Sequence, residues 1–257
     1  MTIPRLYFPE KVEKGDRRVL DRENLNYLKS VLRMKSGDRL FLFDGAGCES
    51  EALILDFTAR GVSVEIVKKE EEKTQDKAVS ITLFQALPKA NKMDSIVRKG
   101  TELGADAIIP FHSARSIPRL SPETALLKTS RWRKIAAEAT RQCGRSRMPE
   151  IGKILSLFEV LEYSPGGGLR IIFWEGETET GLRQVLRDER HEGIKEFVLV
   201  VGPEGGFLRE EVDMATAGGF ISVGLGRQIL KVETASLAIL SILQYEKGIF
   251  NSIGEGI

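Results

Sequence analysis

Two glycine-bearing loops in the last quarter of the chain hold the residues best suited to chemistry. Gly202-Pro-Glu-Gly-Gly206 follows the apolar run 197–201, and Gly226-Arg-Gln-Ile-Leu230 follows a second apolar run at 220–225. Glycine permits tight turns in which backbone N–H and C=O groups are open to a ligand. Ligands of open α/β sheets bind in the crevice beyond the carboxyl ends of the strands. The two loops are therefore predicted to border one small-molecule pocket.

The glycine spacing excludes two common nucleotide-binding loops. The chain lacks GxxxxGK[ST], and Gly202, Gly205 and Gly206 do not make GxGxxG. The first loop is then either an ordinary connection between a strand and a helix or a turn that meets a ligand with its backbone. Leu225, Ile229 and Leu230 are suited to the apolar walls of a pocket for a flat ring.

The elements that must position these loops alternate between strand and helix after residue 78, which predicts an α/β domain with a mostly parallel sheet. Strands are expected at 79–87, 107–111, 171–174, 198–201 and 220–225, and helices at 91–103, 122–143, 181–190, 208–217 and 232–247.

Two of these helices carry further expectations. Gly104 is the expected C-cap of the helix 91–103. The helix 232–247 has almost no polar face, so it lies either deep in the core or against a second subunit. Thr234 either caps that helix or holds the second loop through its hydroxyl.

The pattern of residues 1–70 indicates a separate small unit in which short strands surround one helix. Such an arrangement predicts a small β-barrel. The helix is expected over 21–33, with Asp21 as N-cap and Leu25, Leu28 and Leu32 on one face. The polar run 68–77 is either a domain boundary or an exposed hairpin tip.

The composition of the chain restricts its expected cellular location and the kinds of site it can hold. The 257 residues are 42% hydrophobic and 29% charged, without a membrane-length apolar run or a secretory leader, which predicts a cytoplasmic protein with no membrane contact. Two cysteines and two histidines argue against a disulfide framework and a metal site. Residues 88–147 carry 13 Lys/Arg against 5 Asp/Glu. This block is either a surface that faces a polyanion or a set of solvated helix faces.

Seven segments between residues 3 and 235 carry one resemblance: Ile3–Tyr7, Val31–Met34, Lys99–Gly104, Pro110–Ser116, Glu138–Arg145, Gly202–Gly206 and Leu225–Ala235. They resemble the bacterial uridine-N3 methyltransferases of small-subunit (16S) ribosomal RNA, a family of the SPOUT (α/β-knot) superfamily. One departure is Lys231-Val232, where the family pattern has Arg-Thr, so a side-chain role at position 232 is in question.

The resemblance implies a fold and a reaction. A PUA-like RNA-binding barrel at 1–70 would precede a trefoil-knotted domain at 78–257, which would bind S-adenosylmethionine and pair through the knot region into a homodimer. The product would be 3-methyluridine in 16S ribosomal RNA. The implied cofactor-binding residues are Phe173, Trp174, Val201, Gly202, Pro203, Glu204, Gly205, Gly206, Leu225, Gly226, Ile229, Leu230, Val232 and Thr234.

The reaction sets requirements on side chains. Uridine N3 must be unpaired and must lose its proton before it accepts a methyl group. Glu204 is the candidate base, or it only fixes its loop; Arg145 would stabilise the anion, or it only holds phosphate. The candidate RNA contacts are Arg5, Arg33, Arg98, Lys99, Arg115 and Arg145. Two rival functions stay open, a non-catalytic RNA-binding factor and a nucleotide-binding enzyme with a doubly wound sheet.

Overall fold

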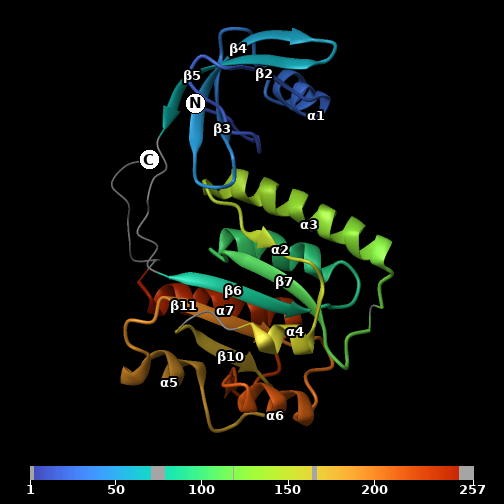
Figure 1. Ribbon diagram of the computed structural model, residues 1–257, viewed down its shortest axis with the longest axis vertical. Helices are drawn as coiled ribbons and strands as arrows, with labels where there is room; N and C mark the ends of the chain where they lie inside the picture. The colour runs from blue at the N-terminus through green and yellow to red at the C-terminus, as the bar shows by residue number, and fades with distance from the viewer. Residues whose placement is uncertain (1–2, 71–78, 118, 164–166, 249–257) are drawn as a thin grey trace. The chain divides into compact units, whose positions relative to one another are not determined.

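The computed structural model describes residues 3–70, 79–117, 119–163 and 167–248, and the chain forms two compact units (Figure 1). Unit 1 comprises residues 1–75 together with 140–148, and unit 2 comprises 76–139 and 149–257. Most of the charge run 68–77 lies outside the described residues. Nothing in the sequence pattern signalled that 140–148 would group with the first unit.

Unit 1 is a curled five-stranded sheet with one short helical segment beside it (Figure 1). Its first strand pairs parallel with the next in the sheet, and the remaining pairs are antiparallel. Alternate residues of the long strands face inward onto Leu28, which is fully buried. The strands, in sheet order, are β1 (Arg5–Tyr7), β3 (Arg39–Phe43), β4 (Glu49–Thr58), β5 (Gly61–Glu70) and β2 (Arg17–Leu20).

The helix expected over 21–33 is shorter and changes type. Asp21 caps α1 (Arg22–Asn26) by accepting the Asn24 N–H, as predicted. The chain then widens into a π-helical turn, η1 (Tyr27–Val31), in which the Leu32 N–H donates to Tyr27 O. An i→i+5 turn holds one residue more than an α turn, so the apolar face rotates. Leu32 is therefore 36% exposed while Leu28 is fully buried, so Leu32 does not share the buried face of Leu28 that the helical spacing predicted.

Unit 2 is a parallel sheet, in the order β12-β10-β11-β6-β7-β8 with β9 paired to β7, as the strand–helix alternation predicted. The strands are β6 (Ser80–Ala86), β7 (Ala107–His112), β8 (Glu150–Ile151), β9 (Leu155–Ser156), β10 (Leu169–Phe173), β11 (Glu196–Val201) and β12 (Ile221–Val223). The helical segments are α2 (Lys92–Glu102), α3 (Pro122–Cys143), α4 (Leu157–Glu162), α5 (Leu182–Leu186), η2 (Glu189–His191), α6 (Arg209–Ala217) and α7 (Val232–Glu246).

Helix α7 is fixed against α2. Gly104 follows α2 with φ of +86°, the left-handed conformation expected of its C-cap region. A Cβ there would lie 2.2 Å from Nε2 of Gln244, which donates to Leu103 O at 2.8 Å. The α7 face built around Ile239, Leu240 and Leu243 is buried, so that side of the helix belongs to the core. Within the described ranges, no helix is long and apolar enough to cross a membrane.

The turn between β4 and β5 provides a test of this fold. Gly61 has φ of +152°, and a Cβ there would lie 1.8 Å from Leu20 O. Gly61→Ala is therefore expected to destabilise unit 1 by about 3 kcal/mol or more. Native-state hydrogen exchange of the β4–β5 amides measures this loss. Gly15→Ala is the matched control, because Gly15 has φ of +89° but open space around it, and about 1 kcal/mol is expected. Equal losses at both sites would contradict the described turn.

Candidate functional site

The two glycine-bearing loops border one cavity of about 450 Å³ in unit 2. The first loop leaves β11, the second leaves β12, and a third wall comes from residues 173–175 at the end of β10. These three strands are neighbours in the sheet, so their carboxyl ends meet at one edge. The predicted adjacency of the loops is thus confirmed. The cavity is lined by Lys92, Phe173, Trp174, Glu175, Val201, Gly202, Pro203, Glu204, Gly205, Gly206, Leu225, Gly226, Arg227, Gln228, Ile229, Leu230, Lys231, Val232 and Ala235.

Every predicted cofactor residue except Thr234 lines this cavity. Thr234 is exposed, on the first turn of α7. The N-cap of α7 is Lys231, and no side chain makes the capping hydrogen bond. The interpretation of Thr234 as a helix cap is therefore wrong, because the helix begins two residues earlier, at Val232. Val232 itself is buried and contributes an apolar wall in place of the family's hydroxyl.

Arg227, Gln228 and Lys231 also line the cavity, as part of the second loop. Sequence reasoning missed the lining residues outside the two loops, namely Lys92, Glu175 and Ala235. Glu175 is the second residue after β10, and a Cβ on Gly206 would lie 1.8 Å from its Oε1. Gly206 has φ of +67°, a left-handed conformation that favours glycine, and any larger residue there would also have to displace the Glu175 carboxylate. The available signal for Glu175 was its position directly after the expected strand 171–174.

Glu204 does not point freely into the cavity. Its two carboxylate oxygens accept the Lys89 N–H at 3.1 and 3.2 Å, and Oε1 also accepts Nζ of Lys92 at 2.8 Å. Burial acts to raise the pKa of Glu204, but the hydrogen bonds and the Lys92 charge outweigh it, so the pKa lies below its ordinary value. The carboxylate is held ionised and occupied, an arrangement that fixes the loop.

Lys92 joins the two loops at the rim of the cavity. Its Nζ lies 2.8 Å from Glu204 Oε1 on the first loop and 3.6 Å from Glu233 Oε2, which is one residue into α7 after the second loop. The hydrogen bond to Glu204 is the main reason that the pKa of Lys92 is raised. Ala90, just before Lys92, has φ of +55°, a costly conformation for a residue with a Cβ. Such strain is typical of segments that a functional site holds in place.

A buried polar network joins the same loops from beneath. Gln85, at the end of β6, is fully buried, and its Nε2 donates to Ala86 O at 3.0 Å and more weakly to Gly202 O at 3.4 Å. Its Oε1 accepts the Ser236 hydroxyl at 2.6 Å, and that hydroxyl also contacts Val232 O at 3.0 Å. The β6–α2 segment therefore supports both loops, through Gln85 below and Lys92 at the rim.

The predicted RNA-contacting residues fall into two groups. Arg33, Arg98 and Lys99 are exposed. Arg115 donates from Nη1 to Gly205 O at 2.7 Å, so it also braces the first loop. In unit 1, Arg5 donates from Nε to Glu49 at 2.5 Å and from Nη2 to Arg145 O at 3.0 Å. Burial lowers the pKa of Arg145 from its ordinary value, although the guanidinium stays charged at neutral pH.

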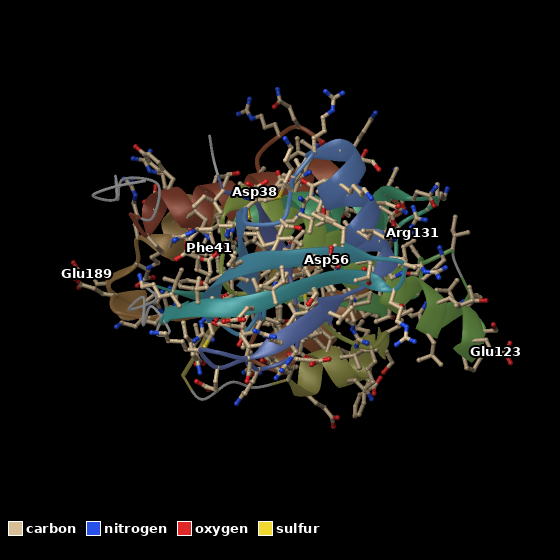
Figure 2. The ribbon with its side chains drawn as sticks, turned by 90° about the horizontal axis from the view of Figure 1, so that it is seen from above. Asp38, Phe41, Asp56, Glu123, Arg131 and Glu189 are labelled. Atoms are coloured by element: carbon tan, nitrogen blue, oxygen red, sulfur yellow. The ribbon has the colours of Figure 1, made fainter. Side chains whose placement is uncertain are left out.

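Other members of the basic block make structural contacts. Arg131, labelled in Figure 2, donates to Asp94 at 2.7 and 3.0 Å, and Asp94 also accepts the Trp132 indole N–H at 3.1 Å. Arg133 donates to Ile151 O at 3.1 Å. Arg141 stacks over the Tyr27 ring at 4.5 Å. Among the residues that the structure describes, no group of three His, Cys, Asp or Glu side chains could hold a metal ion.

Comparison with known proteins agrees with this arrangement. Residues 75–244 match the family model of an RNA methyltransferase domain, and residues 20–67 match that of an RNA methyltransferase PUA domain. Ribosomal RNA small subunit methyltransferase E of Buchnera aphidicola is 32% identical over 96% of this chain and 95% of its own. The chain belongs to the ribosomal RNA small subunit methyltransferase E family. The protein of that name from Bacillus subtilis is 29% identical over 92% of this chain and 93% of its own.

Solved structures extend the comparison to the whole fold. A ribosomal RNA small subunit methyltransferase E from Neisseria gonorrhoeae, bound to S-adenosyl methionine, superposes with a TM-score of 0.83 at 31% identity over 95% of this chain and 98% of its own. A putative methyltransferase from Legionella pneumophila in complex with the same cofactor gives 0.84 at 29% identity, over 95% and 98%.

The ion pair at the cavity rim predicts a pH-dependent contribution to stability. Because the pKa of Glu204 is lowered on folding, the contribution is complete above the ordinary pKa of 4.5 and is lost as pH falls through the folded value. Lys92→Met is expected to lower the melting temperature by about 2 °C at pH 7, with the difference shrinking below about pH 4.

The matched control for this measurement is Lys89→Met. That variant removes an equal charge three residues away but keeps the backbone N–H that donates to Glu204. Its melting temperature should follow the wild type at every pH. A difference for Lys92→Met that is the same at pH 3 and pH 7 would contradict the ion pair.

Proposed function

We propose that this protein methylates N3 of a uridine in 16S ribosomal RNA, with S-adenosyl-L-methionine as the methyl donor. The observation that carries the proposal is the cavity between the two loops of unit 2. It is supported by two solved structures bound to that donor, whose superpositions cover 95% of this chain with TM-scores of 0.83 and 0.84. Membership in a family named for ribosomal RNA of the small subunit supports the substrate.

The cavity suits the proposed donor in its volume, in the apolar and polar groups of its walls, and in its charge. About 450 Å³ lies within the ordinary range for small-molecule sites. Leu225, Ile229 and Leu230 offer apolar walls for an adenine ring, and the backbone of the first loop offers polar groups for its edge. Glu175 and Glu204 bring negative charge to a site for a cation. When bound, the donor supplies an activated methyl group, so the protein must align it with the acceptor.

The acceptor nitrogen must lose a proton, and two residues are proposed for that step. Glu204 either acts as the base or only holds the first loop, and Arg145 is proposed to stabilise the anion or to hold RNA phosphate. The Lys89 and Lys92 contacts of Glu204 support the competing role, in which it holds the first loop. A low-pKa carboxylate that already accepts three hydrogen bonds is a weak base.

The two parts of the chain are proposed to divide the work. Residues 1–70 would act as a PUA-like RNA-binding domain and residues 78–257 as the SPOUT domain. The predicted contacts Arg5, Arg33, Arg98, Lys99 and Arg115 are kept as candidate RNA-binding residues. The protein would act in the cytoplasm, on ribosomal RNA during or after assembly of the small subunit.

A knot and a homodimer are part of the same proposal. The Gly224 N–H donates to Thr180 O at 2.9 Å, and a Cβ on Gly224 would lie 2.3 Å from Glu177 O. This close passage of the chain past the 177–180 segment supports the threading that the family implies. Ile229 is 89% exposed and Tyr245 on α7 is 60% exposed, which supports pairing of two copies through this region.

Nucleoside mapping tests the proposed function directly. Small-subunit RNA from cells with and without the gene is digested and its methylated nucleosides are identified by mass. One 3-methyluridine should disappear without the protein and return when the purified protein and donor are added. Failure of the purified protein to bind S-adenosylmethionine in calorimetry would favour the non-catalytic RNA-binding alternative. Saturable ATP or NAD binding instead would favour the nucleotide-binding enzyme.

Kinetics of Glu204→Gln separate its two roles. A general base contributes about 10²–10⁴-fold, so its loss would lower kcat by that factor. A loop-holding carboxylate predicts that kcat stays within about 10-fold while KM for the donor rises. We expect the second result, because glutamine keeps an acceptor for Lys89 and Lys92 but loses the charge of the Lys92 ion pair, which loosens the first loop. A kcat loss above 100-fold with unchanged donor affinity would establish Glu204 as the base.

A further inference from the structure

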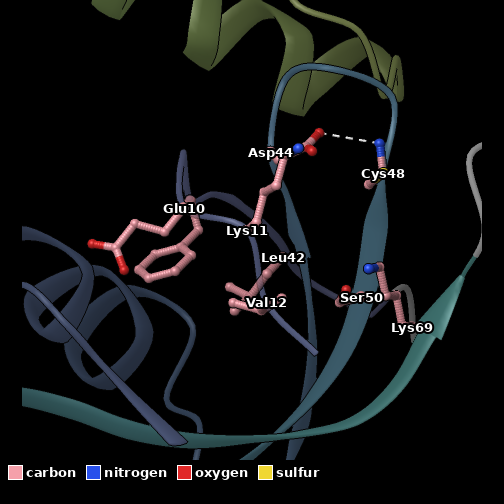
Figure 3. A pocket seen from close by; sticks show the side chains of 9 residues that line it. Glu10, Lys11, Val12, Leu42, Asp44, Cys48, Ser50 and Lys69 are labelled. Carbon is pink, nitrogen blue, oxygen red and sulfur yellow. Dashed lines mark hydrogen bonds between the residues drawn. The ribbon is translucent and has the colours of Figure 1, made fainter. Parts of the chain in front are cut away.

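Unit 1 holds a small pocket of its own, far along the chain from the loops of unit 2. Its volume is about 120 Å³, and it opens between the segment that follows β1 and the ends of β3, β4 and β5 (Figure 3). Phe8, Val12 and Leu42 form the apolar side of the lining. Glu10, Lys11, Asp44, Ser50 and Lys69 provide the polar side, and Cys48 completes it.

Ser50 is the observation that points to a ligand. It occupies an inward position of β4, in the same row as the core residues Ala52 and Ile54. Ser50 is only 3% exposed and lines the pocket, and its hydroxyl makes no hydrogen bond to any residue in the described ranges. Ser50 Oγ is not among the buried polar atoms that lack a partner, so this hydroxyl is reached from the open pocket and is available there to a ligand.

The pocket is held in shape before any ligand arrives. Oδ1 of Asp44 accepts the N–H groups of Ala46, Gly47 and Cys48 at 2.7, 3.1 and 3.0 Å, which fixes the loop between β3 and β4 (Figure 3). On the opposite side, Lys69 Nζ is held by Glu13 at 2.5 Å. A preformed wall reduces the ordering cost of binding.

Size and charge restrict the ligand class. An apolar protein cavity of roughly 150 Å³ binds benzene, so an open pocket of about 120 Å³ takes one six-membered ring that protrudes slightly at the mouth. Two lysines and two carboxylates line it, which makes its formal charge neutral. A phosphate would meet Glu10 and Asp44, whereas a flat neutral ring with donor and acceptor edges suits the Phe8 side and the polar rim.

We propose that this pocket binds one unpaired pyrimidine base of the RNA substrate. The base would lie against Phe8, Val12 and Leu42, and its carbonyl oxygens would accept from the Ser50 hydroxyl and the Lys69 ammonium. The inference rests on the proposed function in that RNA is the source of the base. It adds a site at which unit 1 detects unpaired nucleotides, which RNA-binding proteins read by stacking and by their exposed pairing edges.

Protection of the Cys48 thiol tests the proposal in the full-length chain. The sequence has two cysteines, so in a Cys143→Ser background Cys48 is the only thiol. Its alkylation by N-ethylmaleimide is measured with a single-stranded uridine decamer and with a ten-base-pair RNA duplex. The decamer should slow alkylation at least 5-fold and the duplex less than 2-fold, because the duplex offers phosphates but no free base. Equal protection by both, or none by the decamer, would overturn the proposal.

Variants then locate the base within the pocket. Phe8→Ala and Ser50→Val should each weaken decamer binding about 10-fold, through loss of the ring contact and of the hydroxyl. Phe41→Ala is the matched control, because Phe41 is a half-buried phenylalanine of β3 that does not line the pocket (Figure 2). Phe8→Tyr keeps the ring and should bind like the wild type, which separates ring loss from misfolding. Wild-type affinity in both Phe8→Ala and Ser50→Val would reject the site.

The same preparations distinguish this inference from the proposed function. Donor binding and methyl transfer are measured on each variant alongside decamer binding. If wild-type protein transfers methyl groups but the decamer does not protect Cys48, only the base pocket is rejected. If Cys48 is protected but no methyl transfer occurs, the pocket stands and the methyltransferase proposal falls.

Discussion

The structure of the cavity depends on how two loops that belong to different strands are kept at a fixed separation. Parallel topology brings the carboxyl ends of β11 and β12 to one edge, but it does not set the gap between their loops. Two residues of the β6–α2 segment do so. Gln85 contacts the first loop and the first turn of α7 from the buried side, while Lys92 carries an ion pair to each at the rim. The buried contact provides rigidity, because a satisfied polar group in the core has no alternative partner.

This arrangement changes how Glu204 is understood. A carboxylate beside a cationic donor is an obvious candidate for proton removal. Its oxygens are instead engaged by the Lys89 backbone N–H in the strained turn before α2 and by the ammonium group of Lys92, the first residue of α2. The turn and the loop therefore hold each other through the Glu204 carboxylate. Methyl transfer from an activated donor needs alignment above all, so a site built for rigidity suits the reaction.

The sequence was sufficient for the order of elements and for the meeting of the two loops, because glycine placement and strand–helix alternation are local signals with a known topological consequence. The sequence did not predict the contacts of Lys92 and Gln85, because their partners lie more than 100 residues away along the chain. The sequence also did not predict the change of helix type at Tyr27–Val31, because the prediction of a helix from apolar spacing assumes 3.6 residues per turn throughout. Strands β8 and β9 have two residues each, too few for any periodicity.

The hydrogen bond between Gln85 and Ser236 joins residues 151 positions apart. Contacts of such long sequence separation close late, since the loop entropy must be overcome before they form. During synthesis, the strand that carries Gln85 leaves the ribosome long before α7 does. The contacts that link Gln85 to α7 therefore form only after Ser236 has been synthesised, and a shorter nascent chain lacks this support of the cavity.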